Sequence, residues 1–110
     1  MTKFGNVPTV LFNVKFDSAA EAWYYPILLE RLEAGEIKDL HLQPRYELLP
    51  AFERDGKRIA ATFYQADFDF LEGDARIVLE VKGHETAVWR LKKKMFLHKY
   101  PNLVLRVVRV

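Results

Sequence analysis

Two β-rich segments separated by a short polar turn constrain the fold of this chain more than any other feature. Residues 59–71 (IAATFYQADFDFL) and 75–83 (ARIVLEVKG) are rich in the β-branched and aromatic residues that favour strands. Gly73 and Asp74 lie between them and suit a tight two-residue turn. The sequence therefore predicts an antiparallel hairpin in the second half of the chain.

Such a turn fixes the strand register, because residue numbers at paired positions then sum to 147. Asp67 is predicted to lie opposite Glu80, and Gln65 opposite Lys82. Side chains alternate along a strand, so one face should be largely polar and the other apolar. The polar face would hold Gln65, Asp67, Asp69, Val78, Glu80 and Lys82, and the apolar face Tyr64, Ala66, Phe68, Phe70, Ile77, Leu79 and Val81.

A helix is predicted over residues 18–35. Ser18 can act as its N-cap, and Gly35 lies just past its expected end. Pro26 removes one backbone hydrogen bond and should kink the helix or mark a late start. Apolar residues recur at helical spacing and should face the core, namely Trp23, Ile27, Leu28 and Leu32.

The remaining segments complete an α-β-β-β-α-β order. We expect strands at 37–42, 45–52 and 103–110, a polar turn at 53–58, a second helix over 86–100, and an extended arm or strand within 1–15. In the second helix the residues expected to face inward are Val88, Leu91, Met95 and Tyr100. This order predicts the α/β class, with a mixed central sheet flanked by helices.

Length and composition predict one soluble domain over residues 1–110. The chain has no cysteine, and so no disulfide framework or thiolate metal site. It has no apolar run long enough for a membrane span and no signal-peptide pattern at its N-terminus, so we expect a cytoplasmic protein that does not bind membranes.

Charge is distributed unevenly along the chain. Residues 1–80 contain 9 Lys/Arg and 14 Asp/Glu, a net −5, whereas residues 81–110 contain 8 Lys/Arg and one acid, a net +7. Segregated basic charge is typical of polyanion-binding proteins. A solubilising helix face would give the same pattern, so charge alone leaves both interpretations open.

Asp67 and Glu80, opposed across the hairpin, would repel one another unless a cation lay between them. Carboxylate and carbonyl oxygens with water are the ligands that Mg²⁺ prefers. Lys82, on the same face, could donate to an attacking water or to a phosphate oxygen. These groups together suit phosphodiester hydrolysis. Asp-x-Asp near a turn and Glu-x-Lys on a strand are each also common on solvated, salt-bridged faces.

Four motifs in order, FDSAAEAWYY, LQPRYEL, YQADFDF and LEVKG, make the chain resemble a family of short phage proteins long catalogued as a domain of unknown function. That family is assigned to the PD-(D/E)XK, or restriction-endonuclease-like, nucleases, whose shared core has αβββαβ order. The resemblance spans roughly residues 16–108. Ala66 replaces the proline of the superfamily's name.

The resemblance implies a catalytic site formed by Asp67, Glu80, Lys82 and Glu21. Asp67, Glu80 and the Val81 carbonyl would bind Mg²⁺, for which Mn²⁺ would substitute, and no organic cofactor is implied. Glu21 would complete the metal site or bind a second ion, although Ser18-x-x-Glu21 also fits a capping box.

The predicted DNA contacts lie mostly on the second helix. Its cations would bind backbone phosphates: Arg90, Lys92, Lys93, Lys94 and Lys99, with Arg106 and Arg109 as further candidates on the last strand. Gln43 and His84 are weaker candidates for phosphate contacts. Trp89 could stack on a base, but a core position is the better interpretation. No base-reading module is recognisable, which favours nonspecific or structure-selective binding.

These features together predict a Mg²⁺-dependent DNA endonuclease that acts in phage recombination or replication, in the cytoplasm of the host cell. Analogy to small Holliday-junction resolvases suggests branched substrates and hence a homodimer. The main alternative is a non-catalytic nucleic-acid-binding phage accessory protein, and a third is a protein-interaction module that binds no nucleic acid.

Overall fold

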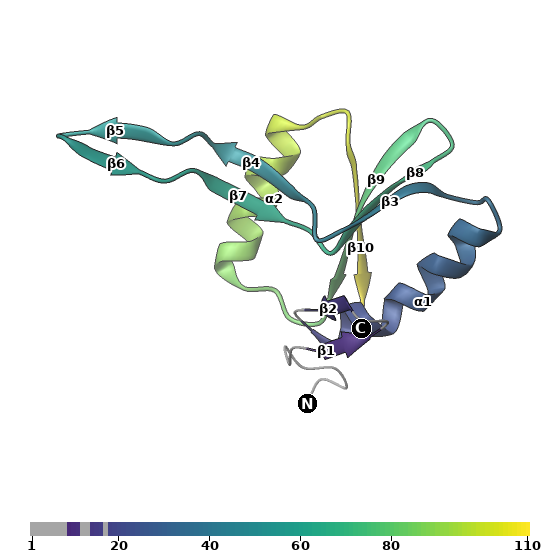
Figure 1. Ribbon diagram of the computed structural model, residues 1–110. Helices are drawn as coiled ribbons and strands as arrows, with labels where there is room; N and C mark the ends of the chain where they lie inside the picture. The colour runs from purple at the N-terminus through teal and green to yellow at the C-terminus, as the bar shows by residue number, and fades with distance from the viewer. Residues whose placement is uncertain (1–8, 12–13, 17) are drawn as a thin grey trace.

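The computed structural model describes residues 9–11, 14–16 and 18–110, and the side chains of residues 18–110 (Figure 1). The helices are α1 (Ala19–Glu33) and α2 (Ala87–Lys99). The strands are β1 (Thr9–Leu11), β2 (Val14–Phe16), β3 (Lys38–Leu42), β4 (Arg45–Leu49), β5 (Phe52–Arg54), β6 (Lys57–Ile59), β7 (Thr62–Gln65), β8 (Phe68–Glu72), β9 (Ala75–Lys82) and β10 (Val104–Arg109). Of the segment predicted as an extended arm or strand, residues 9–11 and 14–15 belong to the antiparallel pair β1–β2, and the rest lies outside the described residues.

The central sheet is mixed, as predicted. Its strands follow the order β10-β9-β8-β3, in which β10 and β9 are parallel and the other neighbours are antiparallel. Both faces of β9 are buried. Ile77 and Leu79 pack in a core with α1, whereas Val78 packs in a second core with α2. The two helices therefore cover opposite faces of the sheet, which is the α/β arrangement expected from the sequence.

The predicted helices are present, but half of the residues predicted to face the core are exposed. In α1 the N-cap is Ser18 and Pro26 lies within the helix, yet Trp23 is half exposed and Leu32 is 37% exposed. In α2 both Val88 and Leu91 are more than half exposed. Leu28 is buried as predicted, and Ile27, Met95 and Tyr100 are partly buried. The buried residues that were not predicted are Ala20, Glu21 and Ala22 in α1, and Phe96 in α2, while Trp89 is buried as expected.

The segment predicted as one strand over residues 59–71 is divided. It begins with the last residue of β6, continues as β7, and resumes as β8 after a break at Ala66 and Asp67. β7 pairs with β4, whereas β8 pairs with β3 and β9. The predicted apolar face is therefore wrong in part: Tyr64 and Ala66 pack in the α2 core, and Phe68 and Phe70 in the α1 core. Gln65 pairs with Arg45 and not with Lys82.

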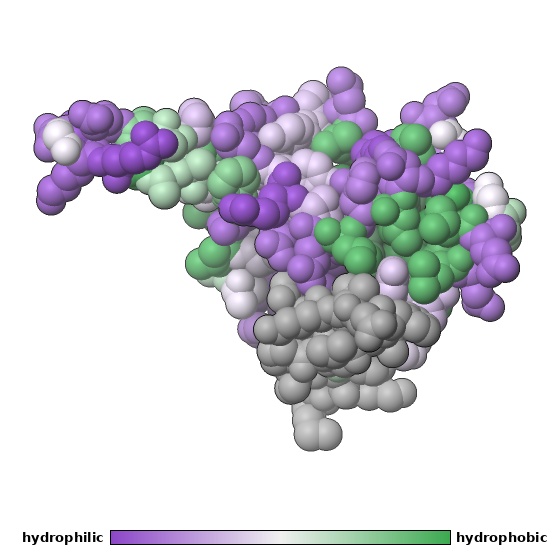
Figure 2. All heavy atoms as spheres, in the orientation of Figure 1, coloured by the Kyte–Doolittle hydropathy of each residue, from purple (hydrophilic) through white to green (hydrophobic). Residues whose placement is uncertain are grey.

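The break sends β4, β5, β6 and β7 away from the central sheet as a long two-stranded arm (Figure 1). Its tip is a two-residue turn at Asp55 and Gly56, both with positive φ, which narrows the predicted turn at 53–58. Hydrophilic side chains cover the tip, and apolar ones lie behind it (Figure 2). All residues of β5 and β6 are exposed, including Phe52 and Ile59, which pair across the two strands.

Among the described residues, neither helix is long and apolar enough to cross a membrane.

Candidate functional site

Three buried carboxyl groups meet at the break between β7 and β8. Glu21 lies in the first turn of α1, Asp67 in the break itself, and Glu80 on β9, and each residue is at most 9% exposed. The Asp67 carboxyl group makes side-chain hydrogen bonds with both Glu21 and Glu80. The structure thus brings together the three acidic residues that the sequence predicted for one site.

Backbone contacts fix the position of Asp67. The predicted register is confirmed through the pair Phe68 and Leu79, where the β8–β9 pairing ends. Asp67 then departs from the strand: its N–H donates to the Leu79 carbonyl at 3.2 Å, and its Oδ2 accepts from the Val81 N–H at 2.6 Å. Asp67 and Glu80 are therefore neighbours at the end of the hairpin, although they do not form a pair within it.

Glu80 is held by a tyrosine that the sequence did not single out. The Tyr64 hydroxyl donates to Glu80 Oε1 at 3.0 Å, and both side chains are buried. Burial raises the pKa of Glu80 to about 8, and the nearby Asp67 carboxylate contributes to the rise, while the Tyr64 hydrogen bond acts in the opposite direction. Without a cation, the surroundings of Glu80 therefore favour its protonated form.

Burial likewise raises the pKa of Asp67. Hydrogen bonds from Glu21, from the Val81 N–H and from Glu80 oppose that rise, as does the charge of Lys82. The ionised form of Asp67 thus receives more support from its neighbours than that of Glu80 does.

Glu21 takes part both in the N-terminal cap of α1 and in the carboxylate cluster. Its N–H donates to the Ser18 hydroxyl at 3.2 Å, which is the first half of a capping box. Its carboxyl group contacts Asp67. Capping of α1 thereby sets the position of the third acid.

Lys82 lies two residues beyond Glu80 and is half-buried. Its Nζ lies 5.1 Å from the centre of the Trp89 ring, which is itself a buried core residue as predicted. Its charge lowers the pKa of both Asp67 and Glu80. Lys82 therefore provides the cationic side of the site.

The oxygen donors suit a hard divalent cation, but they are not arranged around one. Within residues 18–110, no group of three or more His, Cys, Asp or Glu side chains is positioned to hold a metal ion. Asp67 is instead hydrogen-bonded to the neighbouring carboxyl groups and to the Val81 N–H. Ion binding would require proton loss and rotation of the carboxyl groups, and the charge of the ion would favour the ionised form of Glu80, which burial and the Asp67 carboxylate now disfavour.

The predicted DNA-contacting residues are dispersed around this cluster. Gln43 lies next to the cluster, since its N–H donates to the Asp67 carbonyl at 2.8 Å. Its backbone has a φ of +51°, in the left-handed region. His84 is exposed in the loop after β9. Among the α2 cations, Lys99 lies 3.9 Å from Glu47, and Lys93 Nζ lies 5.4 Å from the centre of the Trp89 ring.

The other predicted cations divide into two groups. Arg90 donates to the Glu85 carbonyl, and Lys92 and Lys94 form no ion pair with any described residue. Arg106 and Arg109 are ion-paired with Glu72 and Glu85, respectively. The two β10 arginines are thus already neutralised by nearby acids, unlike Lys92 and Lys94.

Asp69, predicted on the same face as Asp67, belongs to a separate network. It accepts from Tyr46, lies 2.6 Å from His41 Nδ1, and lies 3.3 Å from Arg76. These contacts provide hydrogen-bond and charge partners for the buried Asp69 carboxylate, which lies next to the base of the arm. Nothing in the spacing of Asp69 distinguished it from Asp67, and only the strand break separates them.

A family model described as "Protein of unknown function (DUF1064)" matches residues 1–110. No curated protein and no solved structure matches the chain significantly. Because the match covers the whole sequence, the chain belongs to the DUF1064 family.

Proposed function

We propose that this chain is a Mg²⁺-dependent DNA endonuclease with a restriction-endonuclease-like core. The observation that carries the proposal is the convergence of Glu21, Asp67 and Glu80 in one buried cluster beside Lys82. Buried acids placed in contact are costly unless protons or a cation compensate them, and such clusters occur mainly at functional sites. The motif resemblance and the order α1-β3-β8-β9-α2-β10 support the same assignment.

Each side chain has a distinct role in this proposal. Asp67 and Glu80 would hold the ion, with Glu21 completing the site and the Val81 carbonyl as a further donor. Bound Mg²⁺ would supply charge neutralisation and water activation. Lys82 would stabilise the negative charge that develops on the phosphate, and the Tyr64 hydroxyl and the Val81 N–H would orient the two carboxylates.

The proposed substrate is DNA that is branched or cut without sequence preference, in phage recombination or replication in the host cytoplasm. Two symmetric cuts in a four-way junction would require a homodimer. This part rests on analogy to junction-resolving nucleases of the same superfamily.

The test is cleavage of a supercoiled plasmid and of a synthetic four-way junction, with Mg²⁺ or Mn²⁺ against EDTA. We expect cleavage only with the cation, none with Asp67→Asn, and a loss of at least about 100-fold with Lys82→Met. Asp74→Asn and Lys38→Met are matched controls, since both residues are exposed and lie outside the cluster. Metal-dependent cleavage that survives in Asp67→Asn would rule out this site.

One observation favours the alternative of a non-catalytic nucleic-acid-binding protein: the acids are hydrogen-bonded to one another and, within residues 18–110, are not arranged around an ion. Calorimetry separates the two functions. A nuclease site should bind Mn²⁺, and Asp67→Asn should abolish the binding heat. Salt-sensitive DNA binding with no Mn²⁺ heat in the wild type would favour the alternative.

A further inference from the structure

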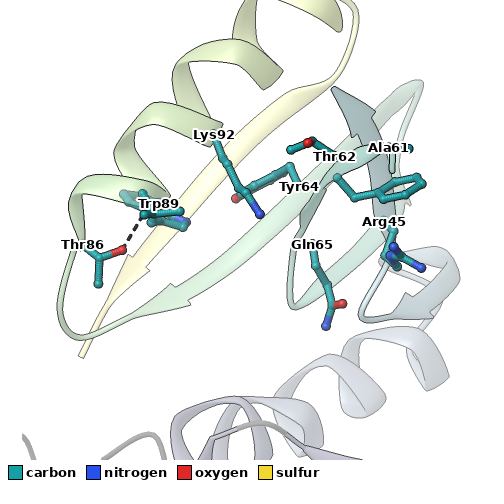
Figure 3. A pocket seen from close by; sticks show the side chains of 10 residues that line it. Arg45, Ala61, Thr62, Tyr64, Gln65, Thr86, Trp89 and Lys92 are labelled. Carbon is teal, nitrogen blue, oxygen red and sulfur yellow. Dashed lines mark hydrogen bonds between the residues drawn. The ribbon is translucent and has the colours of Figure 1, made fainter. Parts of the chain in front are cut away.

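A groove runs between the base of the arm and α2 (Figure 3). Its volume is about 540 Å³. One wall is formed by β4 and β7 together with the residue before β7, and the other by Thr86 and the first turns of α2. The volume lies in the range of pockets that enclose a small ligand, so the groove can admit the backbone of one nucleic-acid strand but cannot enclose a duplex.

The charged side chains in the groove are all basic. Arg45 stands on the arm wall, and Lys92 reaches in from α2 on the other side (Figure 3). No Asp or Glu of the described chain is among the lining residues. Glu47, the acid on β4, is ion-paired with Lys99 and does not line the groove. An anionic ligand would therefore meet two cations from opposite walls and no acidic group from the described residues.

Arg45 is held in a defined orientation. Its guanidinium group lies 4.0 Å from the centre of the Phe63 ring, and both residues line the groove. Stacking against an aromatic face leaves the N–H groups at the guanidinium edge able to donate to a phosphate. Arg45 is thus a preorganised anion-binding group at the base of the arm.

Residues of both groove walls contact the carboxylate cluster or Lys82. Tyr64 lines the groove and donates to Glu80, and Gln65 lines it two residues before Asp67. Trp89 lines the other wall, and the Lys82 ammonium group lies over its ring. Asp67, Glu80 and Lys82 do not themselves line the groove, so a strand lying in it would reach them by continuing past Gln65.

We propose that this groove binds a single strand of nucleic acid, whose backbone phosphates contact Arg45 and Lys92, and that it directs the strand toward the carboxylate cluster. The proposal rests on the proposed nuclease function and narrows it to substrates that have a single-stranded or unpaired segment. The α2 cations outside the groove would then contact the adjoining duplex.

The test measures binding without cleavage. Fluorescence anisotropy in EDTA compares a labelled single-stranded oligonucleotide with the blunt duplex of the same sequence. We expect Arg45→Ala/Lys92→Ala to weaken single-strand binding by at least about tenfold. The slope of log K against log salt should fall by about 1.4, since each phosphate that is no longer neutralised accounts for about 0.7. Duplex affinity should fall by no more than about threefold, because only end fraying would place a strand in the groove.

Arg54→Ala/Lys57→Ala is the matched control, because it removes the same two charges at exposed positions near the tip of the arm, which the proposal does not place in contact with the ligand. It should affect both ligands equally and weakly. Arg45→Lys/Lys92→Arg keeps both charges but not the stacked guanidinium group, and it should bind the single strand more tightly than the alanine pair, which separates loss of charge from misfolding. Equal losses in the test and control pairs, or a charge-retaining variant as weak as the alanine pair, would overturn the groove assignment.

The two proposals fail differently. If the protein cleaves DNA with a metal ion but its DNA binding is unaffected by the substitutions at Arg45 and Lys92, the groove proposal is refuted and the nuclease proposal stands. Groove-dependent single-strand binding without cleavage by the wild type would refute the nuclease and leave the groove intact.

Discussion

Replacing Glu80 with glutamine should make the protein more stable than the wild type at alkaline pH and change its stability little near pH 5. Glutamine has nearly the shape of a protonated glutamate. Its Oε1 can still accept from the Tyr64 hydroxyl, and its amide can donate to Asp67. The substitution therefore keeps the contacts of the neutral acid and removes only the ability to ionise.

The size of the effect follows from the raised pKa. Unfolded Glu80 loses its proton near 4.5, whereas in the folded protein the pKa is about 8. Between these values the native state binds a proton that the unfolded state does not, so stability falls as pH rises. The interval of about 3.5 pH units at 1.36 kcal/mol each sets an upper limit of roughly 5 kcal/mol. Local relaxation and water entry reduce the cost of a buried charge, so we expect a loss of about 2–4 kcal/mol.

The assay is urea unfolding of both proteins from pH 5 to pH 9 in EDTA. The two free-energy curves should lie within about 1 kcal/mol at pH 5 and diverge by about 2–4 kcal/mol at pH 9. Asp74→Asn, a change at an exposed acid, should run parallel to the wild type. Parallel curves for the wild type and Glu80→Gln would refute the reasoning, since Glu80 would then titrate alike in the folded and unfolded states.

Three further changes test other parts of the structure. Phe96→Ala, at a fully buried ring of the α2 core, should lower the free energy of unfolding by about 3–5 kcal/mol in urea titrations, and a loss below about 1 kcal/mol would contradict that position. Ala66→Pro removes the N–H that donates to the Pro44 carbonyl at 3.0 Å and should cost about 1–3 kcal/mol, whereas Ala66→Gly keeps that bond and should cost less. Tyr64→Phe removes a hydrogen bond that lowers the pKa of Glu80, so the Glu80 carboxyl resonance should titrate at higher pH in NMR; an unchanged midpoint would argue against the contact.

The register of the central hairpin was predictable because it depends on local chemistry. A two-residue turn at Gly73 and Asp74 leaves one pairing for the strands, and the structure has that pairing as far as Phe68 and Leu79. Proximity of Asp67 to Glu80 follows from the register. The contact of Glu21 with Asp67 is tertiary and was reached only through the resemblance to nucleases.

The strand break and the arm were missed for a physical reason. Alternation of polar and apolar residues continues through Ala66 and Asp67, so it gives no sign that the chain changes partners there. The prediction of the helix faces was wrong in part because side-chain size, and not hydrophobicity alone, decides which residues pack against the sheet. Small residues such as Ala20 and Ala22 let α1 pack closely on the sheet, while the larger Trp23 remains half exposed.

The break that was missed explains why the acids, the groove and the arm occur together. A two-stranded arm can leave a sheet only where both of its strands bend at the same level. Here the β3–β4 corner and the β7–β8 corner are tied by two backbone bonds, from the Gln43 N–H to the Asp67 carbonyl and from the Ala66 N–H to the Pro44 carbonyl. The bend takes Asp67 out of the β8–β9 pairing and lets its carboxyl group accept from the Val81 N–H beside Glu80. It also places Tyr64 on the α2 side, where it lines the groove and holds Glu80. The geometry of the carboxylate cluster therefore depends on the direction in which the arm leaves the sheet, and a ligand that moves the arm would move Asp67 with it.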